Sequence, residues 1–98
     1  MELNKYQVTI QFTMDEHFMG HVPKHRMYIK ELIDDGVIDY YAVSMESKRT
    51  WMIVNALSKL DVEEYLVKSP LFPYWTFEID ELFVYDGQTY RLPAVQLN

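Results

Sequence analysis

Hydrophobic and polar residues alternate along residues 6–13, where apolar side chains occupy every second position. This period of two predicts a strand with one apolar face. The polar positions between them carry uncharged side chains, which suit a partly enclosed cavity as well as open water. Residues 37–44, 50–56 and 74–85 are rich in β-branched and aromatic residues, and each stretch is also predicted to form a strand.

A helical period replaces this alternation in residues 15–35, where one stripe of apolar side chains predicts an amphipathic helix that ends at Gly36. Pro23 lies inside the pattern, and it either kinks the helix or marks the first turn of its main part. A second helix is predicted to begin after Ser58 and to run to about Lys68. The apolar stripe of the first helix contains Phe18, Val22, Ile29, Leu32 and Ile33.

The predicted elements follow one another in the order β-α-β-β-α-β, which is the ferredoxin-like split βαβ arrangement. It gives an α+β fold with a four-stranded antiparallel sheet and two helices on one face of that sheet. Residues 1–98 form a single domain, in which residues 88–98 are a short C-terminal arm after a turn at residues 86–87. The other face of the sheet is expected to pack against a second copy of the chain, as a dimeric α+β barrel. The aromatic residues expected in the core between sheet and helices are Trp51, Phe72, Trp75 and Phe77.

Composition favours a homo-oligomer and excludes several partners. The chain has 98 residues, of which 49% are hydrophobic and 15% aromatic, whereas a domain this small hides only about 60% of its unfolded surface. A net charge of -6, with 15 acidic against 9 basic residues, argues against a nucleic-acid partner. No apolar run reaches the roughly 18 residues of a membrane span, and the first residues do not resemble a signal peptide. We therefore expect a cytoplasmic protein with no membrane partner, and the lack of cysteine excludes a thiolate nucleophile.

Residues 69–74 have the sequence Ser-Pro-Leu-Phe-Pro-Tyr and lead into the last predicted strand. This proline-flanked segment resembles the muconolactone Δ-isomerase family, and the resemblance extends back to Gly36. It implies a dimeric α+β barrel, often assembled into a ring of dimers, and cofactor-free isomerisation of an unsaturated lactone carboxylate by proton transfer. The isomerases carry basic and histidine residues on the strand after the first helix, where this chain has Asp39, Tyr40 and Tyr41.

A second resemblance, to the YCII-related domain, rests on His25, Asp34 and Gly36, which stand at that family's spacing along the first helix. This resemblance implies a functional pair of a histidine and an aspartate. The two residues are separated by about two and a half helical turns, so their side chains point to opposite sides of a straight helix. We therefore expect no direct contact between them.

Three histidines recur at a spacing of four residues, at His17, His21 and His25. On a continuous helix they would share one side, where two histidines one turn apart can bind a metal ion. Gly20 and Pro23 interrupt the helix between them and no second group of ligands follows, so we expect no metal and no cofactor. His25 falls inside the apolar stripe. It is either a core histidine with hydrogen-bonded ring nitrogens, or a general acid or base at the edge of a cavity.

Glu78 and Tyr40 complete the set of candidate catalytic residues with His25. Glu78 lies on the polar side of the last strand, where it is either a partly desolvated carboxylate suited to proton abstraction or an exposed or interface-paired one. Tyr40 and Tyr41 point to opposite faces of their strand, so only one can reach the same cavity. We expect a cofactor-independent isomerase that transfers a proton on a small lactone or carboxylate. The alternatives are a non-catalytic small-molecule-binding or assembly protein, and monooxygenase or dehydratase chemistry.

Overall fold

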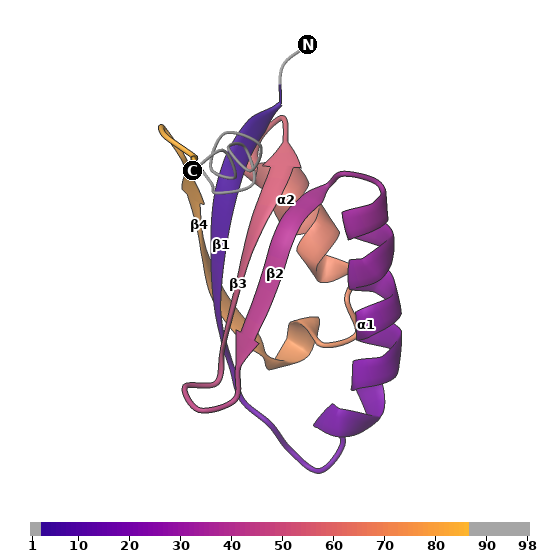
Figure 1. Cartoon of the computed structure of the whole chain (residues 1–98). Helices are drawn as coiled ribbons and strands as arrows, with labels where there is room; N and C mark the ends of the chain where they lie inside the picture. Colours follow the sequence, from indigo (N-terminus) through magenta and orange to yellow (C-terminus); the bar gives the residue numbers. More distant parts are fainter. Residues whose placement is uncertain (1–2, 87–98) are drawn as a thin grey trace, which may run out of the picture.

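The computed structural model describes residues 3–86, which form one antiparallel sheet with two helices packed on one of its faces (Figure 1). The elements are β1 (Asn4–Phe12), α1 (Phe18–Asp34), β2 (Ile38–Ser44), β3 (Arg49–Ala56), α2 (Lys59–Val67), a short 3-10 helix η1 (Phe72–Tyr74) and β4 (Trp75–Glu81). The strand order in the sheet is β2-β3-β1-β4, so β1 and β3 are central and the other two strands lie at the edges. This topology confirms the predicted ferredoxin-like α+β fold.

The core forms between the helices and the face of the sheet that β1 presents to them. Tyr6, Val8 and Ile10 on this face are buried, as the alternation along β1 predicted. Val8 is paired with Met52 of β3 on one side and with Ile79 of β4 on the other. Because directly opposite residues of antiparallel strands point to the same face, the register of β1 extends its apolar face across the sheet.

Helix α1 covers the sheet with a narrower stripe than the sequence predicted. Ile29 and Leu32 are buried, but Ile33 is 42% exposed, so its place in the predicted stripe is corrected. The helix begins at Phe18 and not at residue 15. His17 stands at the N-cap, and in the turn before the helix the Asp15 carboxylate accepts a hydrogen bond from the backbone N–H of His17. Pro23 lies within the helix, in its second turn, where it lacks the N–H that would bond the carbonyl of Met19, and the helix nevertheless continues to Asp34.

The end of α1 follows the predicted glycine cap. Gly36 has a φ of 78°, in the left-handed region that glycine occupies without a steric penalty. Its N–H donates to the carbonyl of Ile33, and the next N–H, from Val37, donates to the carbonyl of Leu32. These two bonds satisfy carbonyls at the end of the helix and turn the chain back toward β2.

Helix α2 begins as predicted, because the Ser58 hydroxyl accepts a hydrogen bond from the backbone N–H of Asp61. Strand β4, by contrast, ends at Glu81 and does not continue to residue 85 as predicted. Its only partner within residues 3–86 is β1, and the pairing ends where Glu81 stands opposite Tyr6, close to the start of β1. The predicted turn at 86–87 and the arm at 88–98 lie outside, or extend beyond, the described residues.

The second face of the sheet carries mostly polar residues, and no helix of the described part of the chain, residues 3–86, covers it (Figure 1). Trp51 points to this face, because it is paired with Thr9 of β1 and Ala42 of β2. The prediction that placed Trp51 in the core with the other aromatic residues is therefore corrected. Trp75 and Phe77 do pack against the core cluster, on the helix side. Within residues 3–86, no helix is both long and apolar enough to span a membrane.

Candidate functional site

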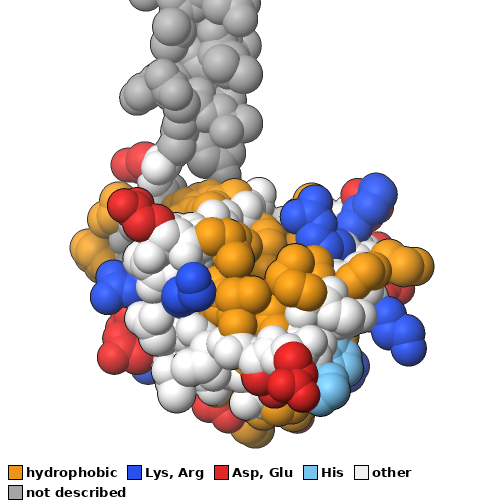
Figure 2. Space-filling model, turned by 90° about the horizontal axis from the view of Figure 1, so that it is seen from below, with side chains coloured by type: hydrophobic (Ala, Val, Ile, Leu, Met, Phe, Trp, Pro, Cys, Tyr) orange, Lys and Arg blue, Asp and Glu red, His pale blue; other side chains and the backbone are white. Residues whose placement is uncertain are grey.

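A cavity of about 160 Å³ opens at one end of the molecule, between the first half of α1 and the strands β2 and β3. Figure 2 views the molecule from this end, where hydrophobic side chains gather in the middle of the surface and charged ones stand around them. The polar groups in the cavity wall are His25, Arg26, Tyr41 and Thr50. The apolar part of the wall includes Phe12, Phe18, Val22, Val43, Leu71 and Trp75.

His25 is the most deeply buried polar residue of this wall, with only 2% of its surface exposed. Its Nδ1 lies 2.7 Å from the Ser69 hydroxyl oxygen, and its Nε2 lies 2.7 Å from the Tyr41 hydroxyl oxygen. Burial, assisted by the nearby charge of Arg26, lowers the pKa of His25 to about 4. The imidazole is therefore neutral at physiological pH, with both ring nitrogens hydrogen-bonded.

Among the described residues that line the cavity, Tyr41 is the only tyrosine, so it contributes the only phenol hydroxyl of the wall. Burial raises the pKa of Tyr41 to about 12, although a hydrogen bond from Thr50 and the charge of Arg26 act in the opposite direction. At neutral pH the tyrosine is therefore protonated and can donate a hydrogen bond. Its hydroxyl lies beside the apolar part of the wall, where it can donate a hydrogen bond to an oxygen atom of a bound molecule.

Arg26 supplies positive charge at the rim of the cavity. It is exposed, it lines both the cavity and a groove between α1 and β2, and no ion pair involves it within residues 3–86. All three residues line the cavity, and the charge of Arg26 lowers the pKa of both His25 and Tyr41. An anionic group of a ligand would find its counter-charge here.

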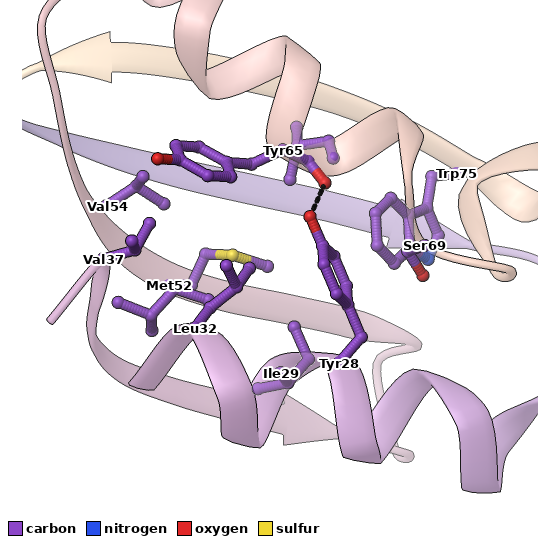
Figure 3. A pocket seen from close by; sticks show the side chains of 11 residues that line it. Tyr28, Ile29, Leu32, Val37, Met52, Val54, Tyr65, Ser69 and Trp75 are labelled. Atoms are coloured by element: carbon purple, nitrogen blue, oxygen red, sulfur yellow. Dashed lines mark hydrogen bonds between the residues drawn. The ribbon is translucent and has the colours of Figure 1, made fainter. Parts of the chain in front are cut away.

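A second, much smaller void lies deeper in the core, between α1, α2 and the sheet (Figure 3). The Tyr28 hydroxyl crosses this region and donates to the carbonyl of Tyr65 at 2.8 Å. The void measures about 10 Å³, which is hardly the space of one water molecule. It is a gap in core packing and holds no ligand, although Trp75 lines both this void and the larger cavity.

The structure does not bring the three predicted site residues together. Glu78 is exposed on the opposite face of the sheet from His25, because it is paired with Thr9, whose side chain points away from the helices. It lines a shallow hollow of about 420 Å³ there with Thr9, Gln11 and other residues. Tyr40 is paired with Ile53 on that same face and is 42% exposed. Only His25 of the three belongs to the cavity.

The three histidines do not converge either. His17 stands before the helix, and the His21 ring lies near the Tyr74 ring, with 6.2 Å between their centroids. Within residues 3–86, no group of three or more histidine or acidic side chains is close enough to hold a metal ion. Asp34 forms an exposed ion pair with Lys30 at 2.9 Å, so it points away from the buried His25 as the helical spacing predicted.

Sequence reasoning missed three residues of the site. Tyr41 was considered only as the alternative to Tyr40, Ser69 was named only as the first residue of the segment that resembles the isomerase family, and Arg26 was not singled out. The signal for Tyr41 was its position one residue from Tyr40, on the other face of the strand. Ser69 lies 44 residues from His25 in the sequence, so no local pattern connects the two.

A scan against models of known protein families and a search of curated proteins both find no match.

Proposed function

We propose that this protein binds a small organic molecule in the cavity beside His25 and Tyr41 and transfers a proton on it without a cofactor. The observation that carries the proposal is the Tyr41 hydroxyl, held 2.7 Å from a buried histidine in the wall of an apolar cavity. Perturbed titratable groups that converge on a cavity are typical of sites for acid–base chemistry. The isomerase resemblance of residues 69–74 supports the same class of reaction.

The size of the cavity limits the ligand to about one ring. A cavity of about 160 Å³ is close to an engineered cavity of about 150 Å³ in another protein that takes up benzene. The apolar wall would enclose the body of the molecule, and Arg26 would attract a carboxylate at the rim. A small lactone or cyclic carboxylate matches both features, whereas a nucleotide or a peptide exceeds the space.

Tyr41 is the group placed to act on the ligand. Moving a proton between two carbon atoms requires a group that gives a proton to one carbon and takes a proton from the other. Within residues 3–86 no acidic residue lines the cavity, so we assign both transfers to Tyr41. Its hydroxyl gives its proton to one carbon of the ligand's double bond, and the tyrosinate that remains, held by a hydrogen bond from His25, takes a proton from the neighbouring carbon. His25 itself acts through Tyr41, because both of its ring nitrogens are already bonded.

Tyr41→Phe tests this function directly. We expect wild-type protein to exchange carbon-bound hydrogen of small unsaturated lactones for deuterium in heavy water, and Tyr41→Phe to slow that exchange by about 100-fold or more. Proton NMR of the lactone measures the exchange rate. Tyr40→Phe is the matched control, because Tyr40 lies on the opposite face of the sheet and its loss should leave the rate unchanged. Equal rates for wild type and Tyr41→Phe would exclude the proposed role.

A non-catalytic binding protein is the second candidate. The observation that favours it is the high pKa of Tyr41, raised to about 12 by burial, which keeps the hydroxyl protonated and suits it to hydrogen bonding and not to taking a proton from a ligand. This candidate expects lactones to raise the melting temperature without any deuterium exchange. Exchange that depends on Tyr41 would exclude it.

We also propose that the protein forms a cytoplasmic homodimer, or a ring of such dimers, through the face of the sheet that carries no helix. Trp51 and Tyr40 lie on this face, and Tyr40 is 42% exposed. The lack of cysteine supports a reducing compartment, since small secreted domains usually depend on disulfides.

Sedimentation velocity tests the interface. We expect a dimer at micromolar concentration for the wild type and a monomer for Trp51→Lys, which would place a charge at the interface. Met27→Lys is the control, because Met27 is exposed on α1, away from the sheet, and its replacement should leave the dimer intact. A wild-type monomer would contradict the proposal.

A further inference from the structure

The buried Ser69 hydroxyl has a single hydrogen-bond acceptor for its proton among the described residues. Ser69 is 4% exposed and follows α2 directly. Its Oγ accepts a hydrogen bond from the backbone N–H of Leu71 at 3.0 Å and lies 2.7 Å from Nδ1 of His25. Within residues 3–86, no other acceptor lies at hydrogen-bond distance from this hydroxyl. The Ser69 proton is therefore bonded only when it points to Nδ1 of His25.

This restriction decides which nitrogen of His25 carries the ring proton. A neutral imidazole has one N–H and one acceptor nitrogen, and the partner of one nitrogen sets the state of the other. With Nδ1 accepting from Ser69, the ring proton stands on Nε2 and is donated to the Tyr41 oxygen. The opposite tautomer would leave the Ser69 proton buried without an acceptor, whereas this tautomer leaves the Tyr41 proton beside a cavity with room for water or a ligand, so the opposite tautomer is disfavoured.

The same arrangement limits where the Tyr41 hydroxyl proton can point. The Tyr41 oxygen accepts from Nε2 of His25 in this tautomer, so its own proton does not point to His25. The proton can then be donated to the neighbouring Thr50 hydroxyl or into the cavity that both residues line. An acceptor oxygen of a ligand in this cavity can take that hydrogen bond.

We propose that Ser69 is a positioning residue that fixes the Nε2–H tautomer of His25, so that Tyr41 presents its hydroxyl proton to the cavity and selects ligands with an acceptor oxygen. The ligands of this class are ketones, lactones and carboxylates, as opposed to hydrocarbons of the same shape. The selectivity rests on the proposed function of the cavity, whereas the tautomer of His25 is independent of it.

NMR decides the tautomer in the full-length protein without any ligand. Two-bond proton–nitrogen correlation spectra of ¹⁵N-labelled protein distinguish a protonated from an unprotonated ring nitrogen, and His25→Gln assigns the His25 signals. We expect Nε2 of His25 to be protonated and Nδ1 to be unprotonated at neutral pH. Ser69→Ala should shift His25 toward the Nδ1–H form, and Ser69→Thr, which keeps the hydroxyl, should retain the wild-type tautomer. A wild-type Nδ1–H tautomer overturns the proposal even if Ser69→Ala does not fold.

A pair of probes of nearly equal shape decides the selectivity. Cyclohexanone carries a carbonyl oxygen where methylenecyclohexane carries a CH₂ group, and both are about the size of the cavity. We expect NMR titration to give about tenfold or more tighter binding of cyclohexanone, and Tyr41→Phe to remove the difference. Equal affinities in the wild type would overturn the selectivity and leave the binding function standing. Failure of both probes to bind would overturn the binding function as well, while the spectra still decide the tautomer.

Discussion

Replacing His25 with alanine is expected to lower the free energy of unfolding by about 3 kcal/mol, because a buried ring and two hydrogen bonds are lost together. The side chain is 2% exposed and packs edge-on against Trp75, with 5.6 Å between the ring centroids. Its removal leaves the buried hydroxyl of Ser69 without an acceptor and enlarges the cavity into the core. A loss of this size is a large part of the stability of a small domain.

Urea denaturation followed by tryptophan fluorescence measures the change in the free energy of unfolding. An unchanged m-value shows that wild type and variant expose similar surface on unfolding, so that their free energies can be compared. His21→Ala is the matched control, because His21 is exposed on the same helix one turn earlier, and its loss should cost less than about 0.5 kcal/mol. His25→Gln keeps a polar group at the site and should cost less than the alanine variant. A His25→Ala variant as stable as His21→Ala would contradict the buried network described above.

The parts of the fold that could be predicted from the sequence are those where one face of an element is buried and the other is not. β1 alternates because its two faces meet different surroundings, and Ser58 and Gly36 mark helix ends through their own local chemistry. The end of β4 could not be predicted, since it depends on where β1 begins, a partner about seventy positions away in the sequence. Ile33 was placed in the core by helical periodicity alone, which does not fix the width of the buried stripe.

The candidate site shows the same division. His25 is buried and both of its ring nitrogens are hydrogen-bonded, which matches the core-histidine alternative. This alternative could be predicted because helical spacing alone places His25 between Val22 and Ile29 in the apolar stripe. The choice between Tyr40 and Tyr41 could not be made, because β2 is an edge strand with a register shift between Ile38 and Tyr40, which changes the face that each residue presents. A contact between a helix residue and Ser69 arises only from tertiary packing.

The buried neutral state of His25 should also make the protein less stable as the pH falls from 6.5 to about 4. In the unfolded chain His25 titrates near 6.5, whereas burial lowers its pKa in the folded protein to about 4. Between these values the unfolded chain binds a proton that the folded protein does not, so acid favours unfolding. The contribution of neutral His25 to the free energy of unfolding is complete above pH 6.5 and is lost as the pH falls through the pKa of the folded protein.

The size of this pH effect follows from the shift in the pKa of His25, and one variant, His25→Gln, isolates the contribution of this residue. The shift corresponds to at most about 3 kcal/mol, and solvent near the cavity mouth reduces the expected change to about 2 kcal/mol. A backbone hydrogen bond from His17 lowers the pKa of Asp15 from 3.8, and at Asp39 burial is outweighed by hydrogen bonds from Lys5 and Asn55, which lower the pKa as well. Their contributions are lost mainly below the lower end of this window. Urea denaturation across the window should therefore give a slope for wild type that His25→Gln largely removes. If His25→Gln loses as much stability as wild type over the same range, His25 is not the group that titrates, and its neutral, hydrogen-bonded state in the cavity wall is contradicted.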